Sequence, residues 1–312
     1  MIESFFVHLI PILIGTLGAA TPLVFAGLGE LVTEKTGVIN LGVEGMMLIG
    51  AVAAFAAAVA TEGNLAVGLM AGALAGALAS LPFGILTLSL GANQAASGLA
   101  LTIFGLGLSA FIGQGFVSYS LSGVKPIAIP LLSKIPLLGP VLFNQDIVVY
   151  LSFVTFGLVA WVLAKTRLGL VLRAVGESPE AAHSIGYPVT AIRYGAVLFG
   201  GAMAGIAGAY LSVVYTPLWV QNMTAGRGWI AVALVVFATW KPARLMLGAY
   251  LFGGVTILQL HAQGFGVAIP SQLLSALPYI ATIVVLVLIS RDRKLLQLNL
   301  PASLGKPFIA GG

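Results

Sequence analysis

The sequence has no cysteine and very little charge. Without cysteine the chain can form neither a disulfide framework nor a thiolate metal site, and it has no cysteine nucleophile. Charged residues make up 7% of its 312 residues and hydrophobic residues 59%, whereas a soluble domain is about 25% charged. These values exclude an ordinary soluble domain and indicate an integral membrane protein.

Long uncharged runs predict how the chain crosses the membrane. Runs such as 5–29, 65–90 and 147–164 reach about the 18–20 residues that a helix needs to cross the hydrocarbon core. They lack the period-2 alternation of barrel strands. We therefore expect an all-α polytopic membrane protein with about nine, eight to ten, transmembrane helices. The predicted segments are 5–29, 38–61, 65–90, 94–116, 147–164, 194–216, 228–240, 245–260 and 273–290. Segment 228–240 is short for a full span, which favours a broken or re-entrant helix.

The basic residues are distributed unequally between alternate loops. One set has eleven members: Lys35, Lys165, Arg167, Arg173, Arg193, Lys241, Arg244, Arg291, Arg293, Lys294 and Lys306. The other has three: Lys125, Lys134 and Arg227. The positive-inside rule places the larger set in the cytoplasm, with the N-terminus outside and the C-terminus inside. Residues 1–294 then form one transmembrane domain with an outer loop at 117–146 and a cytoplasmic loop at 165–193, followed by a cytoplasmic tail at 295–312.

Glycine is abundant, with 40 residues, and two pairs have the spacing that lets helices approach closely in lipid. These are Gly72-x-x-x-Gly76 and Gly201-x-x-x-Gly205. The pairs indicate tight helix packing around a pathway, although such spacings also arise by chance in any glycine-rich membrane chain.

The loop at 165–193 carries the signals of a short helix. Ser178 is a good N-cap, Pro179 suits the first helical position and Glu180 complements the positive end of the helix. Gly186 can end the helix in a left-handed conformation. A helix of about seven residues is marginal in water, so it is either docked on its own protein or shaped for another protein to bind.

Two motifs carry a resemblance to a known family. The run Gly176-Glu177-Ser178-Pro179-Glu180-Ala181-Ala182, followed by Gly186, resembles the cytoplasmic coupling helix of ABC-importer permeases. The stretch EKTGVINLGVEGMMLIGA, residues 34–51, resembles the N-terminal signature of the ribose/branched-chain amino-acid type, in its nucleoside/simple-sugar branch. The resemblance implies a permease subunit in which Glu177 to Ala182 and Gly186 couple to an ATPase. It implies nucleosides as the first substrate, simple sugars second and riboflavin third.

The same resemblance implies partners and a location. It predicts two ATP-binding subunits or one fused ATPase, a second related permease that makes a heterodimer rather than a homodimer, and an extracytoplasmic substrate-binding protein. The location is the inner membrane of a bacterium or archaeon. The sequence has no G-x-x-x-x-G-K-[ST] phosphate loop, so the partner ATPase would use ATP and Mg and this chain would hold no cofactor. The scattered basic residues do not indicate nucleic-acid binding.

Polar residues within the apolar segments are candidates for the translocation path. If the second helix begins near Val38, Asn40 and Glu44 lie four residues apart on one helix face. Glu44 could line a solute path, hydrogen-bond helices together, or mark a helix that begins later. Asn93 and Gln94 are second candidates for the path, and a helix cap at the cytoplasmic surface explains them equally well.

Two other function classes differ from a permease subunit, and only the first stays open. An autonomous channel or ion-coupled carrier could use Glu44 to bind a proton or cation, but it would need no coupling helix. A membrane enzyme has no support, because the sequence has no paired acidic residues, His cluster or nucleophile motif. The three histidines, His8, His183 and His261, are far apart in the sequence, so we expect no metal site.

Overall fold

The computed structural model is an all-α bundle that confirms a polytopic membrane protein. It describes residues 2–136, 138–264 and 299–308, with single positions between 273 and 287. Within these residues, seven helices are long and apolar enough to cross a membrane. They are α1 (Ile2–Lys35), α2 (Val43–Ala60), α3 (Leu65–Gly84), α4 (Gln94–Gly113), α6 (Ile147–Lys165), α9 (Val189–Ala209) and α11 (Pro242–Gly264). The predicted segment 273–290 lies outside the continuously described residues.

Shorter elements lie at or between the ends of these helices. They are α5 (Leu138–Leu142), α7 (Arg167–Glu177), α8 (Pro179–Ser184), α10 (Arg227–Phe237) and the paired strands β1 (Ile127–Ala128) and β2 (Asn144–Gln145). α10 has only 11 residues, which confirms that the segment predicted at 228–240 is short. The loop at 165–193 holds two helices, α7 and α8, of which only α8 is predicted from the sequence.

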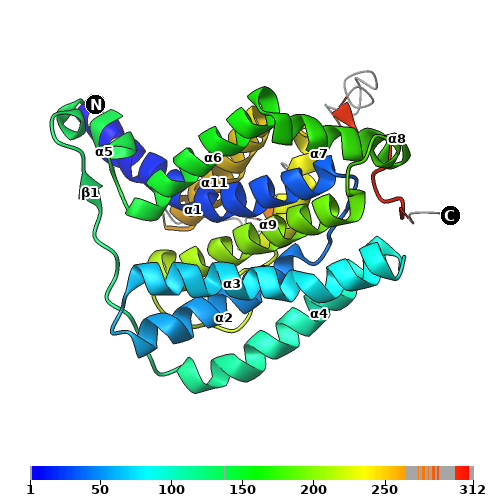
Figure 1. Cartoon of the computed structure of the whole chain (residues 1–312). Coiled ribbons are helices and arrows are strands. Elements are labelled where there is room, and N and C mark those ends of the chain that lie inside the picture. The colour runs from blue at the N-terminus through cyan, green and yellow to red at the C-terminus, as the bar shows by residue number, and fades with distance from the viewer. Residues whose placement is uncertain are drawn as a thin grey trace.

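The two ends of the bundle carry different elements. Figure 1 shows α5 and β1 at the end where the N-terminus lies, and α8 with residues 299–308 at the opposite end. We call these the α5 end and the α8 end. At the α8 end, Lys35 Nζ donates to the carbonyl of Asn299, and Arg193 Nη1 donates to the carbonyl of Lys306. Lys35, Arg193 and Lys306 belong to the predicted cytoplasmic set of basic residues, but the orientation across a membrane stays a prediction.

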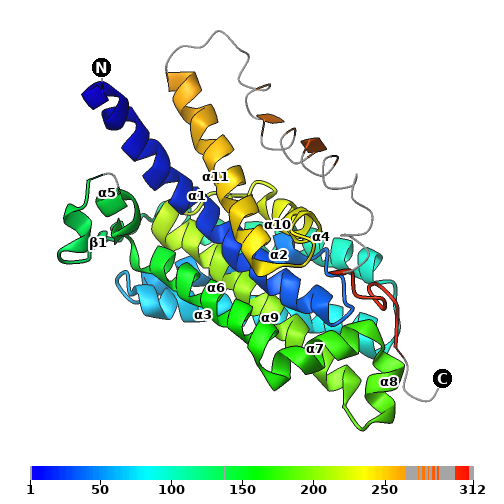
Figure 2. The ribbon, with the colours of Figure 1, turned by 90° about the horizontal axis from the view of Figure 1, so that it is seen from above.

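The core forms around α1 and α9. α9 packs along α1, α2 and α3, and α1 also packs against α10 and α11. In Figure 2, α11 lies beside α1 on the side away from α3. The buried centre includes Phe25, Phe55 and Phe83, each no more than 1% exposed.

The two glycine pairs of the sequence pack directly on each other. A methyl group on Gly205 of α9 would overlap the carbonyl oxygen of Gly72 of α3, and one on Gly76 would overlap the carbonyl of Gly201. Only glycine allows the two backbones to approach this closely. The tight-packing interpretation of both pairs is therefore correct.

We expect Gly205→Ala to destabilise the bundle strongly. The added methyl group must push α3 away from α9, and overpacking of this kind costs about 1–3 kcal/mol. Thermal unfolding of the purified protein in one detergent measures the loss. The matched control is Gly107→Ala in α4, where the new methyl group would have no described atom within 4 Å apart from its chain neighbours and the backbone of its own helix. Equal melting temperatures for the two variants would contradict the contact.

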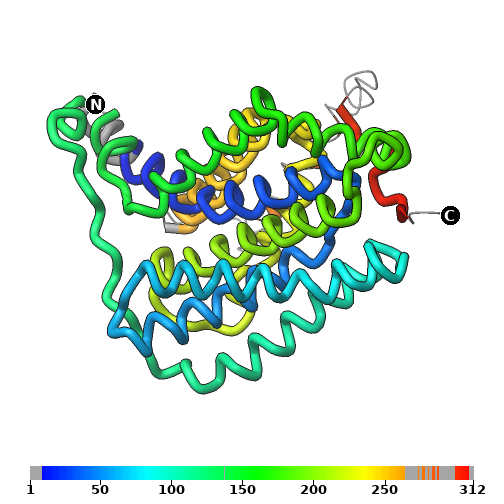
Figure 3. Tube along the Cα trace, in the orientation of Figure 1, coloured from blue at the N-terminus to red at the C-terminus, as the bar shows by residue number. Residues whose placement is uncertain are grey.

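Two predicted helix boundaries are wrong. α1 continues through Glu30 and Glu34 to Lys35, although the first segment was ended at residue 29. α2 begins at Val43, not near residue 38. Residues 36–42 between them are non-helical, and Figure 3 shows the chain turning back there from α1 into α2.

Candidate coupling helix and interrupted membrane core

α8 begins and ends as its sequence predicts. Ser178 Oγ accepts a hydrogen bond from the backbone N–H of Ala181 at 3.3 Å, and Pro179 occupies the first helical position. At the other end Gly186 has φ +95°, a left-handed conformation that favours glycine. The structure therefore confirms this short helix and its caps.

The candidate coupling residues are divided between two faces of α8. Pro179 and Ala182 are buried, and Ala182 packs in a small apolar cluster with Val175 of α7 and Val189 of α9. On the outer side the exposed residues include Glu177, Glu180, Ala181 and Gly186. Ile185, just after the helix, is 73% exposed. The inner face packs α8 against α7 and α9 of the same chain. The outer face exposes the apolar side chain of Ile185 together with the acidic side chains of Glu177 and Glu180.

Glu44 lies in the first turn of α2 and is 3% exposed. Its Oε1 accepts from the Thr224 hydroxyl at 2.5 Å and from the N–H of Gly226 at 2.8 Å, and its Oε2 accepts from the N–H of Gly228 at 2.6 Å. Gly226 and Gly228 form the N-terminus of α10, whose unpaired N–H groups favour a negative charge. The Glu44 carboxylate thus caps α10.

Asn40 and Glu44 do not share a helix face, because Asn40 precedes α2. The Asn40 side chain accepts from the N–H of Gly42 at 2.9 Å, a local bond that shapes the turn into α2. The backbone N–H of Asn40 donates to Glu30 Oε1 at 2.9 Å. The shared-face prediction failed because the helix boundary was drawn too early.

Asn93 and Gln94 have separate roles at the start of α4. Asn93 Oδ1 accepts from the N–H of Ala96 at 2.9 Å, so Asn93 is the N-cap. Gln94 Oε1 accepts from the N–H of Ile39 at 2.8 Å, which attaches α4 to residues 36–42. Among the described residues, Gln94 Nε2 and Glu30 Oε2 are the two buried side-chain atoms without a hydrogen-bond partner. Solute contact by these residues stays a prediction.

Two buried carboxylates of α1 lie outside the predicted segments. Glu30 is 1% exposed and Glu34 is 2% exposed, and both fall between the predicted segments 5–29 and 38–61. Glu34 Oε2 accepts from the indole N–H of Trp240 at 2.6 Å, just beyond the end of α10. Glu30 and Glu34 are four residues apart and directly follow the apolar run. This helical spacing is the signal in the sequence that α1 continues through both residues. Together Glu34 and Glu44 hold the two ends of the α10 segment.

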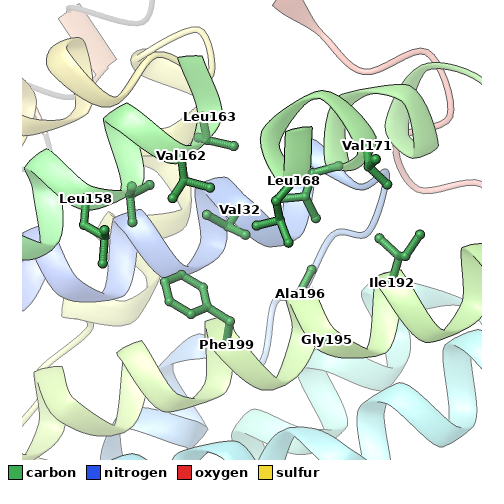
Figure 4. Close-up of a pocket in the computed structure, with 12 residues that line it drawn as sticks. Val32, Leu158, Val162, Leu163, Leu168, Val171, Ile192, Gly195, Ala196 and Phe199 are labelled. Carbon is green, nitrogen blue, oxygen red and sulfur yellow. The ribbon is translucent and has the colours of Figure 1, made fainter. Parts of the chain in front are cut away.

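A cavity of about 400 Å³ lies between α1, α6, α7 and α9. All 12 residues that line it are aliphatic, aromatic or glycine, and Figure 4 shows Leu158, Leu168 and Phe199 around it. Such walls offer no side-chain hydrogen bonds to a polar solute. In the described part of the chain, no three His, Asp or Glu side chains are placed to hold a metal ion.

The chain matches known proteins over most of its length. Residues 12–289 match the family model described as branched-chain amino acid transport system / permease component. The chain is 43% identical to the putative glucose ABC transporter permease protein TsgC13 of Haloferax volcanii, over 87% of this chain and 89% of that protein. It is 35% identical to the nucleoside ABC transporter permease protein NupC of Lactococcus lactis, over 86% and 89%. It is 31% identical to the guanosine ABC transporter permease protein NupQ of Bacillus subtilis, over 95% of both.

The same three organisms each have a second matching permease. These matches are weaker, at 22% to 27% identity. Each organism therefore has two related permeases of different similarity to this chain.

Proposed function

The chain belongs to the family of branched-chain amino acid transport system permease components, and on this basis we propose that it imports a nucleoside across the inner membrane of a bacterium or archaeon. The supporting observation is its 31% and 35% identity to permeases named for guanosine and nucleosides over nearly the whole chain. A simple sugar is the second candidate, because the relative with 43% identity is named as a putative glucose permease.

We place the α8 end in the cytoplasm, where α8 docks on an ATP-binding subunit. This placement is supported by the basic residues at that end and by the exposed outer face of α8 around Glu180 and Ile185. ATP and Mg are used by two such subunits or by one fused ATPase. An external binding protein delivers the solute at the α5 end.

A second, related permease completes the transporter in this proposal. The paired permeases in the three organisms support a heterodimer. We propose that each chain contributes one wall of the path between them.

The non-helical residues 36–42 before α2, together with the start of α10 that Glu44 caps, are our proposed wall of the solute path. Transporters place broken helices at such sites, since non-helical backbone within a membrane must face protein or water. Gln94 can offer its unpaired Nε2 to a solute hydroxyl or ring nitrogen when the path opens. Asn40, Asn93 and Glu44 shape this wall, and Glu44 does so by holding α10. Since three donors of its own chain occupy the Glu44 oxygens, an ion-coupled carrier that uses Glu44 is not favoured.

Uptake into proteoliposomes tests the proposal. The chain, reconstituted with its ATPase subunits, second permease and binding protein, is expected to take up tritiated nucleoside only when Mg-ATP is supplied. Excess unlabelled nucleoside should compete, and excess glucose or riboflavin should compete less. Stronger competition by glucose would favour the sugar candidate. Full uptake by this chain alone in ATP-free liposomes would contradict an ATP-driven importer.

A further inference from the structure

Residues 299–308 pack as a strap against the α8 end of the bundle. The N–H of Gly305 donates to the carbonyl of Gly37 at 3.0 Å, which attaches the strap to residues 36–42. Lys35 Nζ at the end of α1 donates to the carbonyl of Asn299 at 3.2 Å. The N–H and hydroxyl of Ser303 both donate to the carbonyl of Gly176, at 3.0 and 2.7 Å, which attaches it to α7. The strap therefore joins two parts of the chain about 140 residues apart in sequence.

Arg193 holds this junction from the first turns of α9. It is 1% exposed, and its guanidinium donates to Thr36 O at 3.0 Å, Ser303 Oγ at 3.0 Å and Lys306 O at 3.3 Å. All three acceptors are uncharged. A buried cation is costly unless its donors are satisfied, and the planar fork of arginine can satisfy several fixed acceptors at once, which lysine cannot.

The strap also reaches the coupling helix. The ring of Phe308 lies 5.7 Å from the ring of His183 in α8, in an edge-on arrangement. Phe308 packs against the same cluster of Val175, Ala182 and Val189 that anchors α8. The inner face of α8 therefore rests on the strap as well as on α7 and α9.

Residues 36–42 continue this connection into the membrane core. They lead directly into α2, where Glu44 caps α10. Ile39 and Asn40 of the same stretch are bonded to Gln94 and Glu30. A displacement of the strap would therefore move residues 36–42, which form part of the proposed wall of the solute path.

We propose that Arg193 and residues 299–308 form a positioning element that carries movement of α8 to residues 36–42 and so to α10. This inference rests on the proposed function, because it needs an ATPase that moves α8. Arg193 is a positioning residue in this scheme and does not contact the solute. Packed contacts and hydrogen bonds that have two arrangements are the physical means by which such movement is transmitted.

The test measures how many ATP molecules are hydrolysed per solute imported. In the assembled transporter, Arg193→Met removes all three bonds and keeps a long side chain. We expect it to retain assembly and ATP hydrolysis while the ratio of ATP hydrolysed to solute imported rises roughly 2- to 30-fold, the range for residues that carry coupling. Arg167→Gln, an exposed arginine at the start of α7, is the matched control and should keep the wild-type ratio.

Further variants keep the test decisive if Arg193→Met fails to assemble. Ser303→Ala removes the hydroxyl that joins Arg193 to Gly176, and a chain ending at residue 298 removes the strap. Both are expected to raise the ratio. A wild-type ratio in Arg193→Met would overturn the inference, and if that variant does not assemble, a wild-type ratio in the chain ending at 298 would overturn it. If the wild-type complex itself shows no ATP-dependent uptake, the proposed function fails instead, so the two failures are distinguishable.

Discussion

Replacing Glu44 with glutamine is expected to destabilise the protein and weaken its assembly, and not merely to slow transport. The substitution keeps the shape of the side chain but turns one acceptor oxygen into an N–H donor. Three donors meet this carboxylate: the Thr224 hydroxyl and the N–H groups of Gly226 and Gly228. At least one of them would face a donor, and a buried donor without a partner costs about 1–3 kcal/mol. Loss of the charge also removes its favourable interaction with the α10 N-terminus.

Thermal unfolding in detergent and co-purification with the ATPase subunits measure this effect. Glu62→Gln is the matched control, since Glu62 follows the opposite end of α2 and is exposed. The control should melt at the wild-type temperature. Glu44→Ala should melt lower still, because it leaves all three donors without an acceptor. Normal melting and assembly of Glu44→Gln with loss of uptake would instead assign Glu44 to solute contact.

Local signals predicted the coupling segment well because the interactions that form it are local. Ser178, Pro179 and Gly186 lie within nine residues of one another and determine where α8 begins and ends. The amphipathic α7 was predictable on the same grounds. Its buried positions include Leu172 and Val175, three residues apart, but the charged residues around them are also typical of a loop between membrane helices.

Partners far away in the sequence could not be predicted. Glu44 bonds to residues 180 to 184 positions away, and Glu34 bonds to Trp240 across 206 positions. A carboxylate after an apolar run reads as a helix end when its partner is unknown, which explains the wrong end of α1. The wrong start of α2 has another cause: residues 36–42 are held in a non-helical stretch by bonds from Ile39 to Gln94 and from Asn40 to Glu30, which are distant in the sequence. The glycine pairs predicted close packing but not that α3 and α9 pack on each other, because spacing alone identifies no partner.

The outer and inner faces of α8 give two variants that should both abolish ATP-dependent uptake, for different reasons. Ile185→Asp changes a side chain that is 73% exposed, so α8 should fold and only ATPase docking should be lost. If Ile185 anchors the docking surface, its replacement should cost about 2 kcal/mol or more of binding free energy, the range of interface hot spots. Ala182→Asp places a carboxylate in the cluster of Val175 and Val189, where an unpaired charge cannot be accommodated. Gly186→Val should act like Ala182→Asp, because φ +95° strains a β-branched residue.

Co-purification with the ATPase and protease sensitivity of the 165–193 loop separate the two mechanisms. Ile185→Asp should lose the ATPase while its loop stays as resistant as in the wild type, whereas Ala182→Asp should lose the ATPase and expose the loop. Leu131→Asp is the control, because it also replaces an exposed aliphatic side chain with a carboxylate. Leu131 is 83% exposed and lies on the α5 end. The control should retain ATPase binding, and any change should be in its response to the external binding protein.

Intact ATPase binding in Ile185→Asp would remove the outer face of α8 from the docking surface. Loss of binding in the Leu131 control would show that a new exposed charge disturbs assembly wherever it is placed, and the docking assignment would then lose its support.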